Sequence, residues 1–231
     1  MNQQVRLSLL EEGALLFTLL GRTLHGLPDR AFLSELVRQR VFEEIPFLSP
    51  DSAEPARKLL MQWTECCEEH LSDGDFENIK AEYTRLFVGF RRVIAPLWES
   101  VYFNRDRMVF QQQTFQVRAM YTKYGLEVDA KGHEPDDHLS YELLFIARLF
   151  DICAEHLRKG EDALFNENLS DLRSFILCHP LTWVPKWNKL VQKEASTDFY
   201  RGYALLVESS LNQSEIILER LSGAALYSKG A

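Results

Sequence analysis

Residues 134–159 read EPDDHLSYELLFIARLFDICAEHLRK, the longest helical pattern in the chain, and Gly160 follows directly. Apolar residues recur along this segment at intervals of three and four, which is the spacing of a helix face. Two such stripes are present, consisting of Leu139, Leu143, Ala147, Phe150 and Ala154, and of Phe145, Leu149, Ile152 and His156. A helix that is apolar on two faces is packed on both. The pattern predicts a central, buried helix.

The same spacing continues on both sides of this segment. Further helices are expected at about residues 5–20, 29–41, 52–71, 76–89, 111–124, 163–177, 185–195 and 199–221. Ser52, with Pro55 just behind it, is expected to begin the third of these, because serine caps helices and proline suits their first turn. The 126–134 loop is the only candidate domain boundary and is short. We therefore predict an all-α fold, in which residues 1–231 form a single-domain bundle of about ten helices around the central buried helix.

The amino-acid composition indicates which binding partners and which cellular compartment the protein can be expected to have. The chain has 26 basic and 34 acidic residues, a net charge of −8, which opposes nucleic-acid binding and attracts basic peptides. Its four cysteines form no Cys-x-x-Cys pair, as expected in a reducing compartment. The sequence shows neither a membrane-spanning run nor the pattern of a secretory signal. A cytoplasmic location is the expectation.

Residues 90–110 are the least regular part of the sequence. They contain Pro96-Leu97-Trp98-Glu99-Ser100-Val101-Tyr102, which joins a helix-breaking proline to several apolar and aromatic residues. Such a loop either packs into the core or lines a binding surface, and the residues alone leave both interpretations open.

Residues 127–137 form the one cluster of charged residues that we consider as a candidate functional site. It has five acids against the single base Lys131, namely Glu127, Asp129, Glu134, Asp136 and Asp137. One interpretation is an acidic helix start, with Pro135 in the first turn and an i,i+4 pair between His138 and Glu142. Another is a recognition site for a cationic peptide, because carboxylates accept paired hydrogen bonds from guanidinium groups.

A third interpretation is enzymatic. Glu134, Asp137, His138 and Glu142 could supply ligands for a metal-dependent hydrolase. Against this, the sequence has no phosphate-binding glycine loop, no His-Glu-x-x-His and no Gly-x-Ser-x-Gly. We therefore predict no catalytic residue, no metal and no cofactor.

Four segments, in order, resemble those of the TorD/DmsD family of redox-enzyme maturation chaperones. The first is Tyr83–Gly89 (Y-x-x-L-F-x-G), and the second is Pro96–Tyr102, which resembles P-x-x-S-V-[YW] but departs from it at Leu97-Trp98-Glu99, three residues between Pro96 and Ser100. The third is Glu134–His138 (E-P-x-D-H), and the fourth is His179–Pro185 (H-x-x-x-W-x-P). The resemblance covers the chain from about Tyr83 to the end. It implies an all-helical chaperone that binds the twin-arginine signal peptide, or the apo form, of a molybdopterin-dependent oxidoreductase until its cofactor is inserted before export. A nitrate-reductase-type assembly factor with a non-exported client is the alternative within the family, and either a monomer or a helix-exchanged dimer is compatible with it.

The resemblance also nominates a peptide-binding site. It comprises Trp98, Ser100, Val101, Tyr102, Glu134, Pro135, Asp137 and His138. In this hypothesis Asp137 and Glu134 receive the arginines of the peptide, and His138 orients a carboxylate or donates to a peptide carbonyl. Trp98, Val101 and Tyr102 would cover its apolar stretch. The alternative is that Asp137 and His138 only build the helix start.

Overall fold

The computed structural model describes residues 1–67, 70–89, 92–128 and 134–223. Within these ranges the chain forms nine α-helices, one π-helical segment, one 3-10 segment and no β-strand. The α-helices are α1 (Gln3–Leu24), α2 (Arg30–Arg38), α3 (Pro50–Cys66), α4 (Asp73–Tyr83), α5 (Gln112–Lys123), α6 (Leu139–Lys159), α7 (Asp162–Cys178), α8 (Pro180–Glu194) and α9 (Asp198–Leu221). The π-helical segment η1 (Thr84–Val88) extends α4, and the 3-10 segment η2 (Glu99–Tyr102) lies in the irregular stretch. The predicted all-α class is confirmed.

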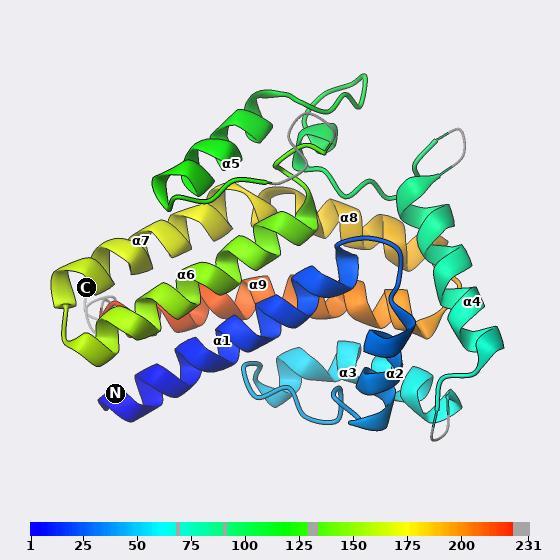
Figure 1. Cartoon of the computed structure of the whole chain (residues 1–231), viewed down its shortest axis with the longest axis horizontal. Coiled ribbons are helices and arrows are strands. Elements are labelled where there is room, and N and C mark those ends of the chain that lie inside the picture. The colour runs from blue at the N-terminus through cyan, green and yellow to red at the C-terminus, as the bar shows by residue number, and fades with distance from the viewer. Residues whose placement is uncertain (68–69, 90–91, 129–133, 224–231) are drawn as a thin grey trace, which may run out of the picture.

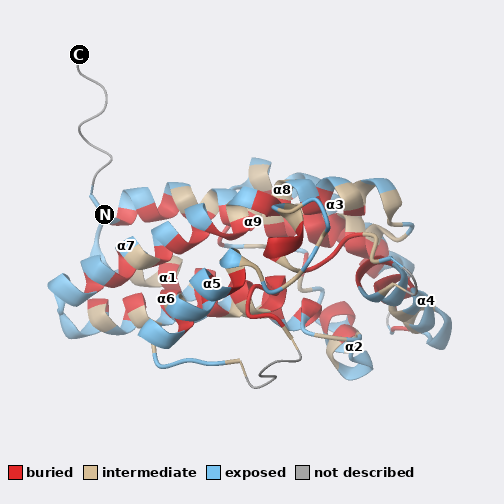
Figure 2. Cartoon of the chain, turned by 90° about the horizontal axis from the view of Figure 1, so that it is seen from above, coloured by how far each residue is buried: buried red, intermediate tan, exposed pale blue. Residues whose placement is uncertain are grey.

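The long helices α1, α6, α7 and α9 run side by side, and α4 stands at the end remote from the amino terminus (Figure 1). Figure 2 shows that buried residues gather along the inward sides of these helices. The predicted position of α6 is confirmed, because its first apolar stripe, including Leu139, Leu143 and Phe150, is completely buried. The second stripe is buried at Phe145 and Leu149 and half-buried at Ile152 and His156.

Glycine allows α1 to approach α6 closely. A Cβ atom at Gly21 would lie 2.6 Å from Cγ of Leu144 and 3.0 Å from the carbonyl oxygen of Ser140. Real Cβ contacts are longer than this, so any larger residue would push the two helices apart. This close contact places the start of α6, and the loop in front of it, beside the end of α1.

Helices α3 and α8 are among those that begin earlier than the sequence predicted. Helix α3 begins at Pro50, where Ser49 caps it by accepting from the amide of Ser52. Helix α8 begins at Pro180, not at Pro185. Each helix contains two prolines five residues apart, and the first of the two opens it, because a first-turn proline loses no hydrogen bond.

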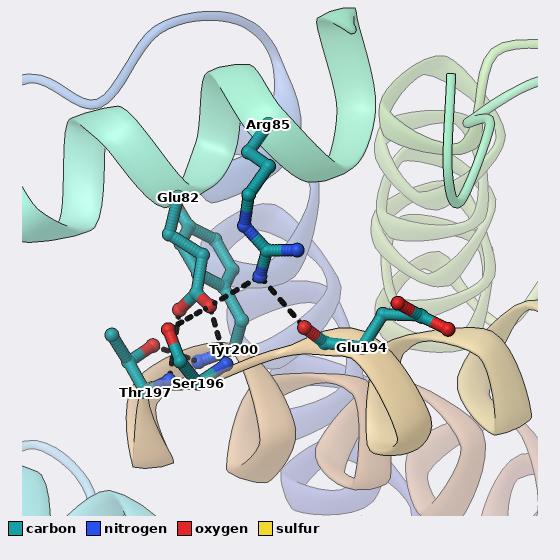
Figure 3. Close-up of polar contacts among 6 residues, drawn as sticks. All are labelled: Glu82, Arg85, Glu194, Ser196, Thr197 and Tyr200. Atoms are coloured by element: carbon teal, nitrogen blue, oxygen red, sulfur yellow. Dashed lines mark hydrogen bonds and ion pairs between the residues drawn. The ribbon is translucent and has the colours of Figure 1, made fainter. Parts of the chain in front are cut away.

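A buried carboxylate fastens α4 to the turn between α8 and α9 (Figure 3). Glu82 accepts hydrogen bonds from the hydroxyl of Ser196 at 2.7 Å, from the amide of Thr197 at 3.0 Å and from Arg85 at 3.0 Å. Arg85 also donates to the carbonyl oxygen of Glu194 at 2.7 Å. Burial alone would raise the pKa of Glu82, but the hydrogen bonds from Thr197 and Ser196 outweigh it and lower the pKa. The ionised carboxylate therefore holds three helices together.

Candidate functional site

The two motif segments that the sequence nominated lie against each other. The amide of Leu139 donates to the carbonyl oxygen of Leu97 at 2.7 Å, and the amide of Glu99 donates to that of Asp137 at 3.0 Å. These bonds form an antiparallel bridge between Trp98 and His138. The loop of residues 96–102, called the site loop from here on, is thereby attached to the segment that precedes α6.

Asp137 lies at the centre of this arrangement and is fully buried. Its Oδ2 accepts from the amide of Ser100 at 2.7 Å, and its Oδ1 accepts from the hydroxyl of Thr114 at 2.8 Å. The carboxylate therefore joins the site loop, α5 and the approach to α6. A guanidinium group of a peptide could reach it only if the loop moved, so the geometry gives Asp137 a positioning role.

The predicted acidic helix start is wrong in position, because α6 begins at Leu139 and not at the acids before it. Asp136 instead forms an ion pair with Arg118, with Oδ2 2.6 Å from the guanidinium nitrogen. Glu134 is half-buried, and its Oε1 accepts from the indole nitrogen of Trp98 at 2.6 Å. The carboxylates of Glu134 and Asp136 line a cavity of about 350 Å³ between the segment before α6 and α5. Asp129 and Lys131 of the acidic stretch lie outside the described residues.

His138 caps α6 and does not form the i,i+4 pair with Glu142 that the helix-start interpretation expected. Its Nδ1 accepts from the amide of Ser140 at 3.2 Å, which requires a neutral ring. Burial, reinforced by His25, lowers the pKa of His138 to about 3. Glu142 lies below the loop, where its Oε2 accepts from the indole nitrogen of Trp183 at 3.3 Å.

Replacing His138 by asparagine is expected to make the protein more tolerant of mild acid. The pKa of His138 is about 3 when folded against an ordinary value of 6.5, so its stability contribution is complete above pH 6.5 and is lost as pH falls. At pH 5 the loss amounts to about 2 kcal/mol relative to neutral pH. Asparagine keeps a capping oxygen but does not titrate, so urea unfolding at pH 7 and 5 should show a smaller difference. His70→Asn, at an exposed position, is the control and should behave as the wild type.

The site loop has an inner and an outer side. Ser100 and Val101 are buried, and so is Pro135 in the facing segment. Trp98 and Tyr102 are half-buried; the ring of Trp98 lies 5.8 Å from that of His138, centroid to centroid. The hydroxyl of Tyr102 donates to the carbonyl oxygen of Pro96 at 2.8 Å. Of the eight nominated residues, Trp98, Tyr102 and Glu134 thus keep the most accessible surface.

The geometry does not support the metal-dependent hydrolase. In the part of the chain that the structure describes, no three His, Cys, Asp or Glu residues lie close enough to hold a metal ion. Glu134 and Asp137 accept hydrogen bonds from the loop, and Glu142 lies beneath it. The four residues nominated for that reaction therefore do not converge on one point.

Thr114 and Arg118 are site residues that the sequence analysis missed. Both lie on α5, about twenty positions before the acids that they contact, and neither belongs to a recognisable motif. Their spacing of four, on one face of a predicted helix, was the only signal in the sequence.

Among the described helices, none combines the length and the apolar composition needed to cross a membrane.

Comparison with known proteins agrees with this architecture. The profile of the family described as nitrate reductase delta subunit matches residues 49–189. A probable Tat proofreading chaperone DmsD of Haemophilus influenzae is 27% identical over 148 residues, which cover 64% of this chain and 66% of the relative. The chaperone protein TorD of Aliivibrio salmonicida is 25% identical over 53% of this chain and 55% of its own length.

A third relative, the Tat proofreading chaperone DmsD of Salmonella typhi, is 26% identical over 59% of this chain and 60% of its own. In each case the match spans less than two thirds of the relative's length. The family profile covers well over half of the chain and includes the site loop, the segment before α6 and the start of α8. The chain belongs to the nitrate reductase delta subunit family, the family of the TorD and DmsD chaperones.

Proposed function

We propose that this protein is a cytoplasmic chaperone for a molybdopterin-dependent oxidoreductase subunit. It acts as a single domain and without catalysis, binding the twin-arginine signal peptide, the apo form of the subunit, or both. It holds the client until the cofactor is inserted before export. Support comes from the names of its relatives, which are Tat proofreading chaperones and TorD chaperones. The observation that supports the proposal most strongly is that the site loop and the segment before α6 are bridged to each other, with Trp98 and Glu134 hydrogen-bonded and half-buried at their surface.

The charge of the site favours a basic peptide. Glu134 is a partly exposed carboxylate whose Oε1 is already bound to Trp98, which fixes its orientation. A fixed carboxylate can accept the parallel hydrogen bonds of an arginine more readily than a mobile one, because less side-chain entropy is lost. The net charge of −8 attracts a cationic leader at longer range. Glu134 is therefore the carboxylate that we assign to arginine recognition.

The aromatic residues beside it suit the apolar part of a leader. Trp98 and Tyr102 lie on the outer side of the site loop, and Ser100, Val101, Pro135, Asp137 and His138 form the rigid frame behind them. Burial of apolar area contributes about 25 cal/mol per Å², so the hydrophobic contact supplies most of the affinity and the charge sets the register. While the leader is bound here, the export machinery cannot bind it.

A peptide titration tests this assignment. A leader-like peptide with an arginine pair followed by apolar residues is expected to bind the wild type, and its lysine-pair counterpart to bind more weakly. Glu134→Gln keeps an acceptor for Trp98 but removes the charge, so arginine-pair affinity should fall about tenfold, the size of one charge-assisted hydrogen bond. Glu44→Gln, which removes an exposed charge between α2 and α3, is the matched control. Unchanged affinity in Glu134→Gln would show that the arginines bind elsewhere.

The client itself is identified by affinity capture from anaerobically grown cells of the source organism. A precursor molybdoenzyme that retains its leader is the expected partner. The family description, nitrate reductase delta subunit, favours one alternative, an assembly factor whose client has no exported leader. Capture of a leaderless reductase subunit would establish that alternative, and absence of any oxidoreductase would contradict the chaperone function.

A further inference from the structure

Beneath the site loop lies a buried polar cluster built from four segments. Glu99 comes from η2, Glu142 from α6, His179 from the junction of α7 and α8, and Trp183 from α8. Each is at most 7% exposed. Nδ1 of His179 lies 2.9 Å from Oε2 of Glu99, and the indole nitrogen of Trp183 donates to Oε2 of Glu142 at 3.3 Å. The carboxyl groups of Glu99 and Glu142 lie within interaction range of each other.

If the carboxyl groups of Glu99 and Glu142 were both ionised, the cluster would lack one hydrogen-bond donor. Oε1 of Glu142 is completely buried and, among the described residues, receives no hydrogen bond from any N–H or hydroxyl group. The Glu142 carboxyl interacts with that of Glu99, which is itself an acceptor when ionised. Because His179 and Trp183 already serve one oxygen of each carboxyl, a single proton between the two groups satisfies the arrangement. Two unshielded negative charges at this depth would be strongly unfavourable.

We propose that Glu142 carries this proton and that its hydroxyl donates a hydrogen bond to the carboxylate of Glu99. This hydrogen bond is the lower attachment that keeps the site loop in its client-binding shape. Asp137 is the upper attachment, through Ser100. Glu99 and Glu142 are then positioning residues, which act through Trp98 and Tyr102 on the same loop. This consequence for binding rests on the proposed function, whereas the position of the proton does not.

The electrostatics of the pocket support a neutral Glu142. Burial raises its pKa well above the ordinary value, and the nearby charges of Glu99 and Asp137 raise it further. The titratable groups that face it are Glu99 from η2, Asp137 from the segment before α6, Tyr121 from α5 and, through Glu99, His179. Only His179 among them can bring a positive charge. If the loop lifts, Glu99 enters water and the proton is released, so rising pH favours the lifted form by up to tenfold per pH unit.

Infrared spectroscopy of the whole protein tests where the proton is. The wild type is expected to show the carbonyl stretch of a buried protonated carboxyl at neutral pH. Glu142→Gln should lose this band but keep the fold, because its amide NH₂ donates to Glu99 in place of the hydroxyl. Glu99→Gln serves if the first variant does not fold: burial still keeps Glu142 neutral there, so the band should persist but shift in frequency, because the hydroxyl then donates to an amide oxygen in place of a carboxylate. No such band in the wild type, a band that survives in folded Glu142→Gln, or an unshifted band in folded Glu99→Gln would overturn the proposal.

The pH dependence of unfolding provides a second readout. The pKa of Glu142 is raised in the folded state, so its contribution is present at low pH and is lost as pH rises through the folded pKa. The unfolding equilibrium constant of the wild type should therefore increase with pH relative to that of Glu142→Gln, by up to tenfold per pH unit. Parallel curves for the two proteins would contradict a buried proton at this position.

The pH dependence of peptide affinity tests whether the proton on Glu142 controls binding at the site loop. Wild-type affinity for the arginine-pair peptide is expected to fall on the alkaline side, while that of Glu142→Gln stays flat. Glu134→Gln binds more weakly but should keep the wild-type slope, because it leaves the buried pair intact. A wild-type slope that persists in Glu142→Gln would refute the control of the loop by the proton. If no peptide binds, the proposed function fails, and the infrared and unfolding measurements still decide the position of the proton.

Discussion

Replacement of Asp137 by alanine is expected to lower the free energy of unfolding by about 3 kcal/mol, because it leaves two buried donors without an acceptor. These donors are the amide of Ser100 and the hydroxyl of Thr114, each less than 3 Å from a carboxylate oxygen. The loss is several times that of an exposed acid in a helix first turn, about 0.3–1 kcal/mol. Chemical denaturation at neutral pH measures it directly.

The same variant also tests the role of Asp137 in binding. Where Asp137→Ala still folds, the site loop has lost its upper attachment, and peptide affinity should fall although Asp137 itself does not touch the peptide. Asp137→Asn keeps one acceptor oxygen and should give intermediate values in both measurements. A loss of stability below 1 kcal/mol with unchanged affinity would show that the loop is held by other contacts.

Glu82→Ala is expected to destabilise the protein by about 3–4 kcal/mol, since it removes a buried, multiply hydrogen-bonded carboxylate that joins α4 to the α8–α9 turn. The amides and hydroxyl that it served, at Ser196 and Thr197, would lose their acceptor. Arg85→Ala is the matched control, because the arginine is 43% exposed and its removal leaves the other bonds intact. That control should cost no more than about 1 kcal/mol.

Acid should reveal the same interaction. Because the pKa of Glu82 is lowered in the folded state, its contribution is complete above the ordinary glutamate pKa of 4.5 and is lost as pH falls through the folded pKa. The difference in stability between the wild type and Glu82→Gln, which has no charge to lose, should therefore shrink below that pH. A difference that stays constant down to pH 3 would argue against an ionised, hydrogen-bonded Glu82.

The central helix could be predicted from sequence because its two apolar stripes leave little choice of environment. The start of α8 could not, since Pro180 and Pro185 are equally plausible first-turn residues and only packing distinguishes them. For the site, the resemblance brought Trp98 and His138 into one hypothesis, and the structure places them in contact.

The protonation and burial of the site carboxyls could not be read from the sequence. Asp137 and Glu142 occur among other acids near a helix start, a pattern that usually indicates a solvent-exposed turn. Their burial depends on Thr114, Glu99 and Trp183, which come from parts of the chain 23 to 43 residues away in one direction or the other. No local pattern encodes contacts of that range.

The attachment of Glu82 to Ser196 also determines when the molecule can become complete during its synthesis. The two residues are 114 positions apart, and the partner of α3 is likewise the late helix α9. Until the ribosome has released α9, the apolar face of α3 lacks its covering helix and Glu82 lacks its partners in the α8–α9 turn. Contacts of such long sequence separation form slowly. The nascent chain therefore exposes the apolar face of α3 until most of its own length has been synthesised.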